Sequence, residues 1–270
     1  AFGSVQSIIA LVAPMAAGAL MSFASIESLF FVDVATAALA IAIVLGLLRV
    51  GPHERARGKL ELSYWKDLRA GFGYVLGHAY VKRFFLFCAA FLFLAAPVAF
   101  LTPLQVTRTF GNDVWRLTAL EIVFSVGMTL GGILIGAWGG FRNRVRTMAL
   151  SSFIVGATTA ALGLFPWFVP YLGVMALCGV AMPLFNAPAA VLLQEKVESE
   201  FMGRVFGVLS MISSVMMPLG MLVFGPLADA VRIEALLVGT GVGIFLLGNR
   251  VLLAAGNREA EGGSAQSMGS

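Results

Sequence analysis

The chain has 270 residues, of which 59% are hydrophobic and 12% charged, and its mean hydropathy is +0.93. Soluble globular domains carry about 25% charged residues, so this composition excludes that class of protein. The formal net charge is +4, from 18 Lys and Arg against 14 Asp and Glu. No basic stripe with interleaved aromatic residues accompanies this charge, so it does not indicate nucleic-acid binding.

Eight apolar stretches follow one another along the chain. Each is close to the roughly 20 residues that a helix needs to cross the hydrocarbon core of a bilayer. Because no water reaches the backbone inside a bilayer, each stretch is predicted to be a helix. The sequence therefore predicts an all-α integral membrane protein with eight transmembrane helices, at residues 5–23, 29–48, 84–106, 117–139, 147–165, 167–193, 205–227 and 235–254.

Basic residues gather in every second gap between these stretches. Fifteen of the 18 Lys and Arg lie after the second, fourth, sixth and eighth stretches, and the other gaps hold only Arg108, Arg116 and Arg232. The loops of membrane proteins that are rich in Lys and Arg are the cytoplasmic ones. The four basic gaps, and with them the C-terminus, are therefore predicted to be cytoplasmic, in a multi-pass protein of the cell membrane.

A weak internal repeat relates the start of the chain to its end. Pro14 in the first stretch matches Pro218 in the seventh, and Ile-Glu-Ser-Leu at 26–29 matches Ile-Glu-Ala-Leu at 233–236. Both pairs run in the same direction, as in transporters built from two parallel halves. A repeat of six helices predicts twelve helices in all, so we expect four more helices upstream of a chain that begins inside its first stretch.

The predicted organisation has four parts. Residues 1–50 hold the last two helices of a first bundle, and residues 84–254 form a six-helix second bundle. Between them, residues 51–83 form a cytoplasmic loop with an amphipathic helix, because apolar residues recur every three or four positions from 62 to 76. Residues 255–270, rich in Gly, Ser, Ala and Glu, are predicted to be a disordered cytoplasmic tail.

Four segments of the predicted second bundle carry its most informative motifs. They are LTALEIVFSVGMTLGGILIGAWGGFRNR at 117–144, PLFNAPAAVLLQEKV at 183–197, GRVFG at 203–207 and MPLGMLVFGPLAD at 217–229. These segments resemble the major facilitator superfamily of transporters, and within it the macrolide-efflux-like and enterobactin-exporter-like branch. The resemblance implies a twelve-helix exporter of which this chain holds helices five to twelve.

The first of these segments departs from the superfamily's pattern in its cytoplasmic loop. The motif of this loop usually carries an Asp before its basic cluster, whereas Gly139 and Gly140 stand there in this chain. The residues of this chain that align with the motif are Gly136, Gly140, Arg142 and Arg144. The missing acid weakens the implication that this loop forms the superfamily's usual charge-relay gate.

Glu121 lies inside the fourth stretch, where an ionised side chain costs about 2.5–3.5 kcal/mol unless it is paired or faces a cavity. Ser125, Gly132 and Gly136 share its side of a helix. Because small residues favour close helix packing, we expect Glu121 to point into the protein. It is a candidate proton carrier or ligand of a cationic substrate. The alternative is a static partner for a group such as Arg116.

Asp33, in the second stretch, is a further candidate for proton coupling or substrate binding. Thr36, Ala37 and Ala40 share its side, so it is expected to face neighbouring helices. The resemblance implies that this helix is an outer support, away from the cavity. A structural hydrogen bond is therefore the alternative hypothesis for Asp33.

Two proline-glycine pairs are candidate gates. Pro14 and Gly18 resemble the motif that antiporters of the superfamily carry in helix five, although Ala13 replaces the glycine before the proline. Pro218 and Gly220 repeat the arrangement in the seventh stretch. Pro removes an intrahelical hydrogen bond and Gly permits a close approach, so each pair favours a kink, for gating or for packing alone.

The third and sixth stretches line the central cavity if the resemblance holds. Their aromatic and Met side chains suit a large apolar substrate, with a few polar side chains as specific contacts. The alternative for each of these residues is packing against lipid or against a neighbouring helix. The candidate cavity residues are Phe91, Phe93, Thr102, Gln105, Met182, Phe185 and Asn186.

The chain lacks the sequence motifs of common enzyme classes. No GxxxxGK[ST] or GxSxG segment occurs, and His53 and His78 lack the spacing of metal ligands. Cys88 and Cys178 lie in apolar stretches, as expected for buried reduced thiols. We therefore expect no cofactor, no metal and no enzyme activity.

The sequence leads to the hypothesis of a secondary active transporter that works by alternating access. The resemblance implies export of a hydrophobic or amphipathic small molecule, such as a drug, a macrolide-like compound or a siderophore. Coupling to protons is expected because the chain shows no nucleotide site. The expected partners are the lipid bilayer, the substrate and protons, with no nucleic acid, and the protein is expected to be a monomer. The alternatives are a non-transporting sensor or assembly partner of the same fold, and an integral membrane enzyme.

Overall fold

The computed structural model describes residues 26–47 and 64–267, with side chains placed at residue 31 and at 34–43 and 67–253. Every regular element of these residues is an α-helix, which confirms the predicted all-α class. The helices are α2 (Ile26–Leu47), α4 (Tyr64–Gly77), α5 (Ala79–Phe110), α6 (Val114–Trp138), α7 (Arg144–Leu162), α8 (Phe168–Lys196), α9 (Met202–Ala230) and α10 (Ile233–Ser267).

Six of these helices, α5 to α10, have the length and the hydropathy of membrane spans. They coincide with the third to eighth apolar stretches of the sequence. Within its described residues α2 contributes a shorter apolar run, Val34–Ile43. The first predicted stretch, at 5–23, lies outside the described residues. The structure thus confirms a multi-pass helical membrane fold.

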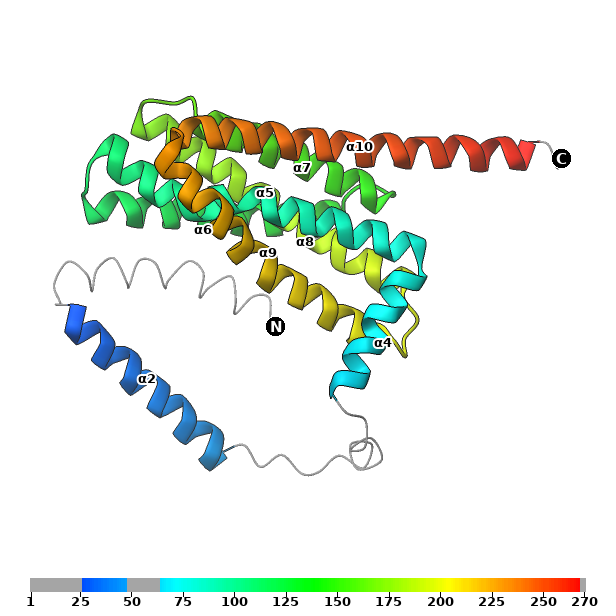
Figure 1. Cartoon of the computed structure of the whole chain (residues 1–270), viewed down its shortest axis with the longest axis horizontal. Helices are drawn as coiled ribbons and strands as arrows, with labels where there is room; N and C mark the ends of the chain where they lie inside the picture. Colours follow the sequence, from blue (N-terminus) through cyan, green and yellow to red (C-terminus); the bar gives the residue numbers. More distant parts are fainter. Residues whose placement is uncertain (1–25, 48–63, 268–270) are drawn as a thin grey trace.

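Helices α5 to α10 form one bundle (Figure 1). Helix α8 packs along both α6 and α7, α7 also packs along α10, and α5 packs along α9 and α10. The buried side chains form two clusters. One includes Phe91 and Phe185 and extends to α4, and the other includes Leu120 and Tyr171 and extends to Ile233 at the start of α10.

Glycines set the closest helix contacts of the bundle. On α7 and α10, Gly156 and Gly241 face each other, and a Cβ added to Gly156 would lie 2.7 Å from the carbonyl oxygen of Gly241. Helices in a bilayer gain little from the hydrophobic effect when they associate, so close packing of small residues is a main source of their affinity. These glycines therefore explain why α7 and α10 form an extended contact.

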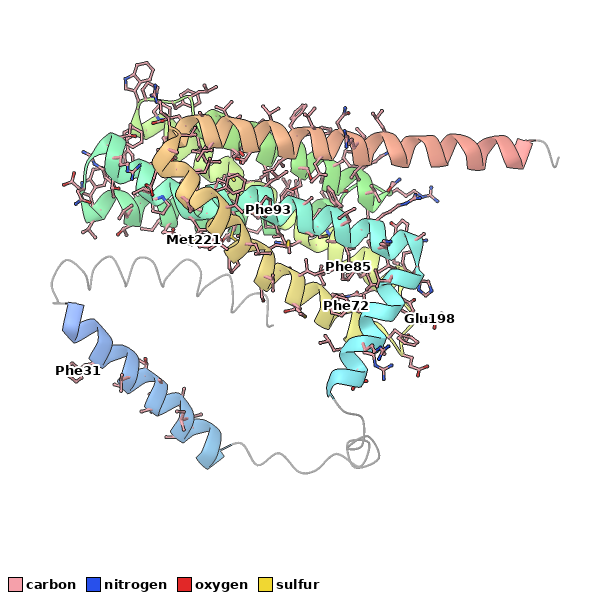
Figure 2. The ribbon with its side chains drawn as sticks, viewed as in Figure 1. Phe31, Phe72, Phe85, Phe93, Glu198 and Met221 are labelled. Atoms are coloured by element: carbon pink, nitrogen blue, oxygen red, sulfur yellow. The ribbon has the colours of Figure 1, made fainter. Side chains whose placement is uncertain are left out.

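Burial is uneven among the six spans. In the most apolar part of α9, 17% of the residues are buried inside the described structure, and in α6 28%, against 56% in both α5 and α7. Helices α6 and α9 therefore present the largest unpaired apolar faces of the bundle. Met221 of α9, 52% exposed, lies on such a face (Figure 2).

Helix α2 makes few contacts with the rest of the described structure. Every side chain that is placed on it is exposed, including Phe31 at 76% and Val34 at 66%. Phe31 projects away from the bundle in Figure 2. An apolar helix with no buried face needs lipid or further helices around it. The predicted assignment of α2 to a different bundle stays a prediction.

Helix α10 continues to Ser267, through residues for which the composition predicts a disordered tail. In Figure 1 its last turns extend beyond the bundle. Ala and Glu recur at 254–267 and no Pro interrupts them, so a helix that begins against α7 can continue, although Gly256, Gly262 and Gly263 have low helix propensity. The structure differs here from the sequence-based expectation.

Candidate functional site

Glu121 lies on the open side of α6, where it is exposed. It is seven residues beyond Val114, roughly 10 Å along the helix axis at about 1.5 Å per residue. Gly132 and Gly136 share its side, and a Cβ added to either would meet nothing within 4 Å. The prediction that Glu121 points into the packed protein is therefore wrong for the described residues, although its grouping with these two glycines is correct.

The packed face of α6 includes two other glycines, together with the buried Leu120 and Ser125. A Cβ added to Gly127 would collide with the backbone of Ala176, and one added to Gly131 with the backbone of Val180. On α8, Gly179 approaches the backbone of Phe124 in the same way. Gly127 and Gly131 lie close to 100° around the helix from Glu121. The α6–α8 contact therefore turns Glu121 away from α8.

Four of the predicted cavity residues are buried inside the bundle. The rings of Phe91 and Phe185 stack at 4.1 Å between centroids and join α5 to α8. The Thr102 hydroxyl donates to the carbonyl oxygen of Val98 at 2.6 Å. Both aromatic rings and the Thr hydroxyl thus have partners within the bundle itself, and none of these three side chains is open to a cavity.

Gln105, the fourth of these buried residues, is part of a polar network between three helices. Its Nε2 donates to the carbonyl oxygen of Leu162 on α7 at 3.0 Å, and its Oε1 accepts from the Tyr171 hydroxyl on α8 at 2.9 Å. Gln105 is 2% exposed and Tyr171 is fully buried. This network satisfies polar groups that would be costly inside a bilayer. Tyr171 was not predicted as a partner, since a single Tyr in an apolar stretch carries no pairing signal.

The other three predicted cavity residues are less buried. Phe93 is partly buried, with its ring 5.3 Å from that of Phe224 on α9, and Met182 packs against both core clusters. Asn186 is exposed on α8. Since Gly131 lies beside Val180, Asn186 and Glu121 are separated by roughly 25 Å along the two parallel helices. The structure does not bring these two polar residues together.

The loop motif between α6 and α7 has a conformation that requires glycine. Gly139 and Gly140 have φ values of 74° and 76°, in the left-handed region that side chains with a Cβ rarely adopt. The amide of Gly139 closes α6 by donating to the carbonyl oxygen of Ile135 at 2.8 Å. The amide of Phe141 donates to Thr147 Oγ1 at 2.9 Å. The superfamily's motif usually has an Asp at this place, and in this chain the backbone there adopts a conformation that favours glycine.

Arg144, in the basic part of the motif, pairs with a carboxylate on helix α8. Arg144 Nη1 donates to the carbonyl oxygen of Gly139 at 2.7 Å, and its Nε lies 3.9 Å from Glu195 Oε1 at the end of α8. Arg142 and Gly136 are exposed, and Gly136 has no close neighbour. The loop is therefore tied to α8 by one partly exposed ion pair and to α6 by a backbone contact.

Helix α4 is held against the start of α9. Arg204 donates to Asp67 Oδ1 from Nε at 2.9 Å and from Nη2 at 2.8 Å. The Tyr74 ring stacks on that of Phe201 at 4.8 Å, and a Cβ on Gly71 would come within 3.1 Å of the Arg204 carbonyl oxygen. The face of α4 that packs on the bundle therefore combines the Asp67 carboxylate with the buried side chains of Tyr74 and Val75. Sequence reasoning missed this pair, because 137 positions separate its members.

Of the two proline-glycine pairs, one lies in the described residues. Pro218 is exposed, and Gly220 is buried where α9 crosses α5: a Cβ added there would collide with Ala96 and lie 3.0 Å from the carbonyl oxygen of Phe93. Gly220 thus permits the close approach that the sequence suggested. Pro14 and Gly18 lie outside the described residues. The same is true of the side chain of Asp33, whose backbone lies in α2.

Comparison with curated proteins places efflux proteins among the relatives of this chain. It is 27% identical over 233 residues to macrolide efflux protein A of Streptococcus pyogenes, which covers 86% of this chain. It is 27% identical over 220 residues to macrolide efflux protein A of Enterococcus faecalis, covering 81% of this chain and 68% of that protein. Multidrug efflux pump Tap of Mycolicibacterium fortuitum is 26% identical over 137 residues, which are 50% of this chain and 32% of that protein.

The chain spans 57% of the length of the S. pyogenes protein. A family model with the description Major Facilitator Superfamily matches residues 1–221, which include α2 and the spans from α5 through most of α9. The match covers the larger part of the chain and agrees with its apolar helices. This chain therefore belongs to the Major Facilitator Superfamily.

Proposed function

We propose that the protein is a secondary active transporter of the plasma membrane that exports a hydrophobic or amphipathic small molecule in exchange for protons. Membership of the superfamily supports transport, and the names of the relatives support efflux of drugs such as macrolides. Movement of two bundles about a central site would give alternating access.

The observation that carries this proposal is the position of Glu121 on an open face. It is the carboxylate furthest from a helix end among the side chains that the structure places in α5 to α10. A carboxylate at such a depth is costly unless it serves an aqueous path or a partner. Its side of α6 carries Gly132 and Gly136, which leave room beside it. A proton or a cationic substrate group can therefore reach it without displacing the α6–α8 contact.

The faces of α6 and α9 support the proposed substrate class. Both are apolar, unburied and free of charged side chains along their central turns apart from Glu121. Such surfaces suit a large apolar molecule with few polar groups, held by contact area and not by many hydrogen bonds. The exposed apolar side chains of the central part of α9 are Met211, Val215, Leu219, Met221, Leu222 and Val223.

The first bundle of the transporter would include α2 and would pack against these faces of the second bundle. We place the C-terminus and the loop before α7 in the cytoplasm, because that side carries most of the Lys and Arg. On the same side, the Asp67–Arg204 contact attaches the central loop to α9. A movement of one bundle would therefore reach α9 through α4. The proposed transporter acts as a monomer.

Efflux assays test the proposal directly. The protein, expressed from its complete gene in cells without their own efflux pumps, is expected to speed the loss of a preloaded hydrophobic fluorescent drug, and a protonophore is expected to abolish this efflux. Glu121→Gln removes the titratable group at nearly constant size, so uphill efflux should fall at least tenfold. Glu234→Gln is the matched control, because Glu234 lies in the first turn of α10 beside Arg232 at 3.5 Å.

Two results would contradict the proposal. Efflux that survives the protonophore would exclude proton coupling. Absence of efflux for drugs and siderophores alike, from well-expressed protein in the membrane, would favour a non-transporting sensor or assembly partner of the same fold. The observation that favours a non-transporting protein is the loop motif, in which Gly139 and Gly140 replace the usual Asp.

A further inference from the structure

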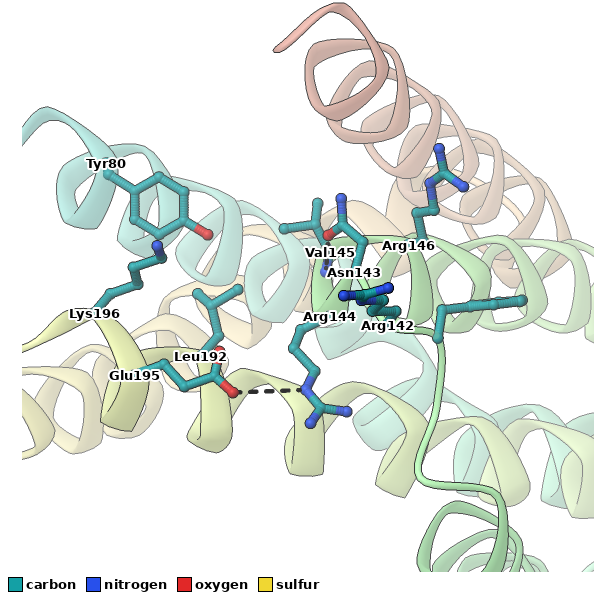
Figure 3. Close-up of a pocket in the computed structure, with 10 residues that line it drawn as sticks. Tyr80, Arg142, Asn143, Arg144, Val145, Arg146, Leu192, Glu195 and Lys196 are labelled. Atoms are coloured by element: carbon teal, nitrogen blue, oxygen red, sulfur yellow. Dashed lines mark hydrogen bonds and ion pairs between the residues drawn. The ribbon is translucent and has the colours of Figure 1, made fainter. Parts of the chain in front are cut away.

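Two cavities adjoin each other at the end of the bundle where α6 ends and α7 begins. The first, of about 630 Å³, lies between the loop before α7, the start of α5 and the end of α8 (Figure 3). The second, of about 490 Å³, lies beside α7 and includes Leu252 of α10. Phe141 and Arg146 line both cavities. The two spaces therefore share a wall.

The first cavity is strongly cationic. Arg142, Arg144 and Arg146 approach it from one side and Lys196 from the other (Figure 3). Glu195 is the one carboxylate among its lining residues, and it lies 3.9 Å from Arg144. In the described part of the chain, no ion pair joins Arg142 or Lys196 to a carboxylate.

The backbone adds to this positive potential. Helix α7 begins at Arg144, so the positive end of its dipole lies at the same cavity. Asn143 caps one amide by accepting from Val145 at 3.0 Å. The positions of the charges thus suit an anion at the level of the membrane surface, where the spans end.

The second cavity is apolar and continues from this surface into the membrane. Arg146, Leu150 and Phe153 follow each other at spacings of four and three residues, so they share one face of α7. The distance from Arg146 to Phe153 along the axis is roughly 10 Å at about 1.5 Å per residue. Leu252 completes the cavity from α10. A basic side chain therefore stands at the mouth of an apolar groove.

We propose that these two cavities bind one anionic phospholipid, with its phosphate among Arg142, Arg144 and Lys196 and an acyl chain along Leu150 and Phe153. A free phosphate could occupy only the first, cationic cavity, whereas a phospholipid would also place an acyl chain in the second, apolar cavity. Basic pockets between transmembrane helices on the side of the basic loops are suited to anionic lipid headgroups. The bound phosphate would compete with Glu195 for Arg144, so lipid would loosen the contact between the loop and α8.

Lipid binding can be measured without transport, so failure of this proposal is distinguishable from failure of the proposed function. The protein, expressed from its complete gene and purified in detergent, would be titrated with phosphatidylglycerol or phosphatidylcholine, and bound lipid counted by native mass spectrometry. Phosphatidylglycerol should bind more tightly. Removing both unpaired cations in Arg142→Gln/Lys196→Gln should weaken its binding about 30-fold, or five- to sixfold per charge.

A matched double variant, Lys82→Gln/Arg250→Gln, also removes one Lys and one Arg from exposed positions outside both cavities. It should bind phosphatidylglycerol as the unmodified protein does. Leu150→Trp fills the apolar groove and should weaken lipid binding at least fivefold. Leu252→Trp, on α10, tests the same groove if the α7 variant melts at a lower temperature than the unmodified protein.

Three outcomes would overturn the proposal. Equal weakening in the two double variants would show general attraction to anionic lipid and no specific site. Equal affinity for the two lipids would exclude selection of the headgroup charge. Displacement of phosphatidylglycerol by inorganic phosphate, together with no effect of either groove-filling variant, would make the first cavity a site for free anions.

Discussion

Two neighbouring glycines on α6 provide a sharp test of which face of this helix is packed. Gly131 and Gly132 are adjacent, lie in the same helix and have the same chemistry. A Cβ on Gly131 would collide with the carbonyl oxygen of Val180 and lie 2.9 Å from its Cα and carbonyl carbon, whereas one on Gly132 would meet nothing within 4 Å. We therefore expect Gly131→Ala to destabilise the protein relative to Gly132→Ala.

The expected difference in stability between Gly131→Ala and Gly132→Ala can be worked out from helix propensity, which changes equally in both variants, and from overpacking, which affects Gly131→Ala alone. Both gain about 1 kcal/mol of helix propensity when Ala replaces Gly. Gly131→Ala alone overpacks the α6–α8 contact, which costs about 1–3 kcal/mol. Relief of the collision by separating the helices by on the order of 0.5–1 Å would weaken their dispersion contacts by a quarter to a half. The two variants should thus differ by about 1–3 kcal/mol.

The assay is thermal unfolding of the protein, expressed from its complete gene, in detergent. Intrinsic fluorescence is a suitable signal because Trp115 and Trp138 lie in α6. At about 2–4 °C per kcal/mol, the melting temperature of Gly131→Ala should be roughly 2–12 °C below that of Gly132→Ala. Gly127→Ala should behave as Gly131→Ala does, because its Cβ would collide with the backbone of Ala176. Equal melting temperatures for the three variants would refute the packing of α6 on α8.

Three further predictions concern polar contacts. In a double-mutant cycle of Asp67→Asn and Arg204→Gln, melting should report a coupling of about 0.5–1 kcal/mol, because both side chains are partly exposed. Tyr171→Phe leaves Gln105 Oε1 without its donor in the bundle interior and should lower the free energy of unfolding by about 0.6–1.7 kcal/mol in denaturant titrations. Gly140→Ala places a Cβ at a φ of 76° and 2.9 Å from a hydroxyl oxygen, so the melting temperature should fall by the equivalent of about 1–2 kcal/mol.

Each of these predictions has an outcome that would contradict it. Strictly additive effects of the Asp67 and Arg204 variants would mean that α4 is not held by this ion pair. A Tyr171→Phe protein as stable as the unmodified one would show that Gln105 finds another donor. For the loop, Gly73→Ala on α4 serves as the comparison, since a Cβ there meets nothing within 4 Å. A Gly140→Ala protein that melts no lower than Gly73→Ala would exclude the left-handed conformation.

Polar residues in apolar stretches show where sequence-based prediction of the site failed. Thr102 and Gln105 were candidate contacts for a substrate, with packing as the alternative, and their hydrogen-bonding groups pair with Val98, Leu162 and Tyr171 inside the bundle. A sequence shows that a polar side chain needs a partner in the membrane, but not whether that partner is a backbone carbonyl, another helix or a ligand. The same limit applies to Arg204, whose partner Asp67 lies on a helix far away in the sequence.

The sequence by itself determined the helices, because the bilayer acts on each segment separately: a stretch of about 20 apolar residues must satisfy its own backbone hydrogen bonds wherever it packs. It also supplied the family, through motifs that are local in the chain. Only the tertiary structure decided which face of each helix is buried. On α6, the pair Gly127 and Gly131 and the pair Gly132 and Gly136 have the same spacing, so the spacing alone does not show which pair is packed. The shape of α8 at Ala176 and Val180 selects the first pair, and that choice leaves Glu121 on the open side.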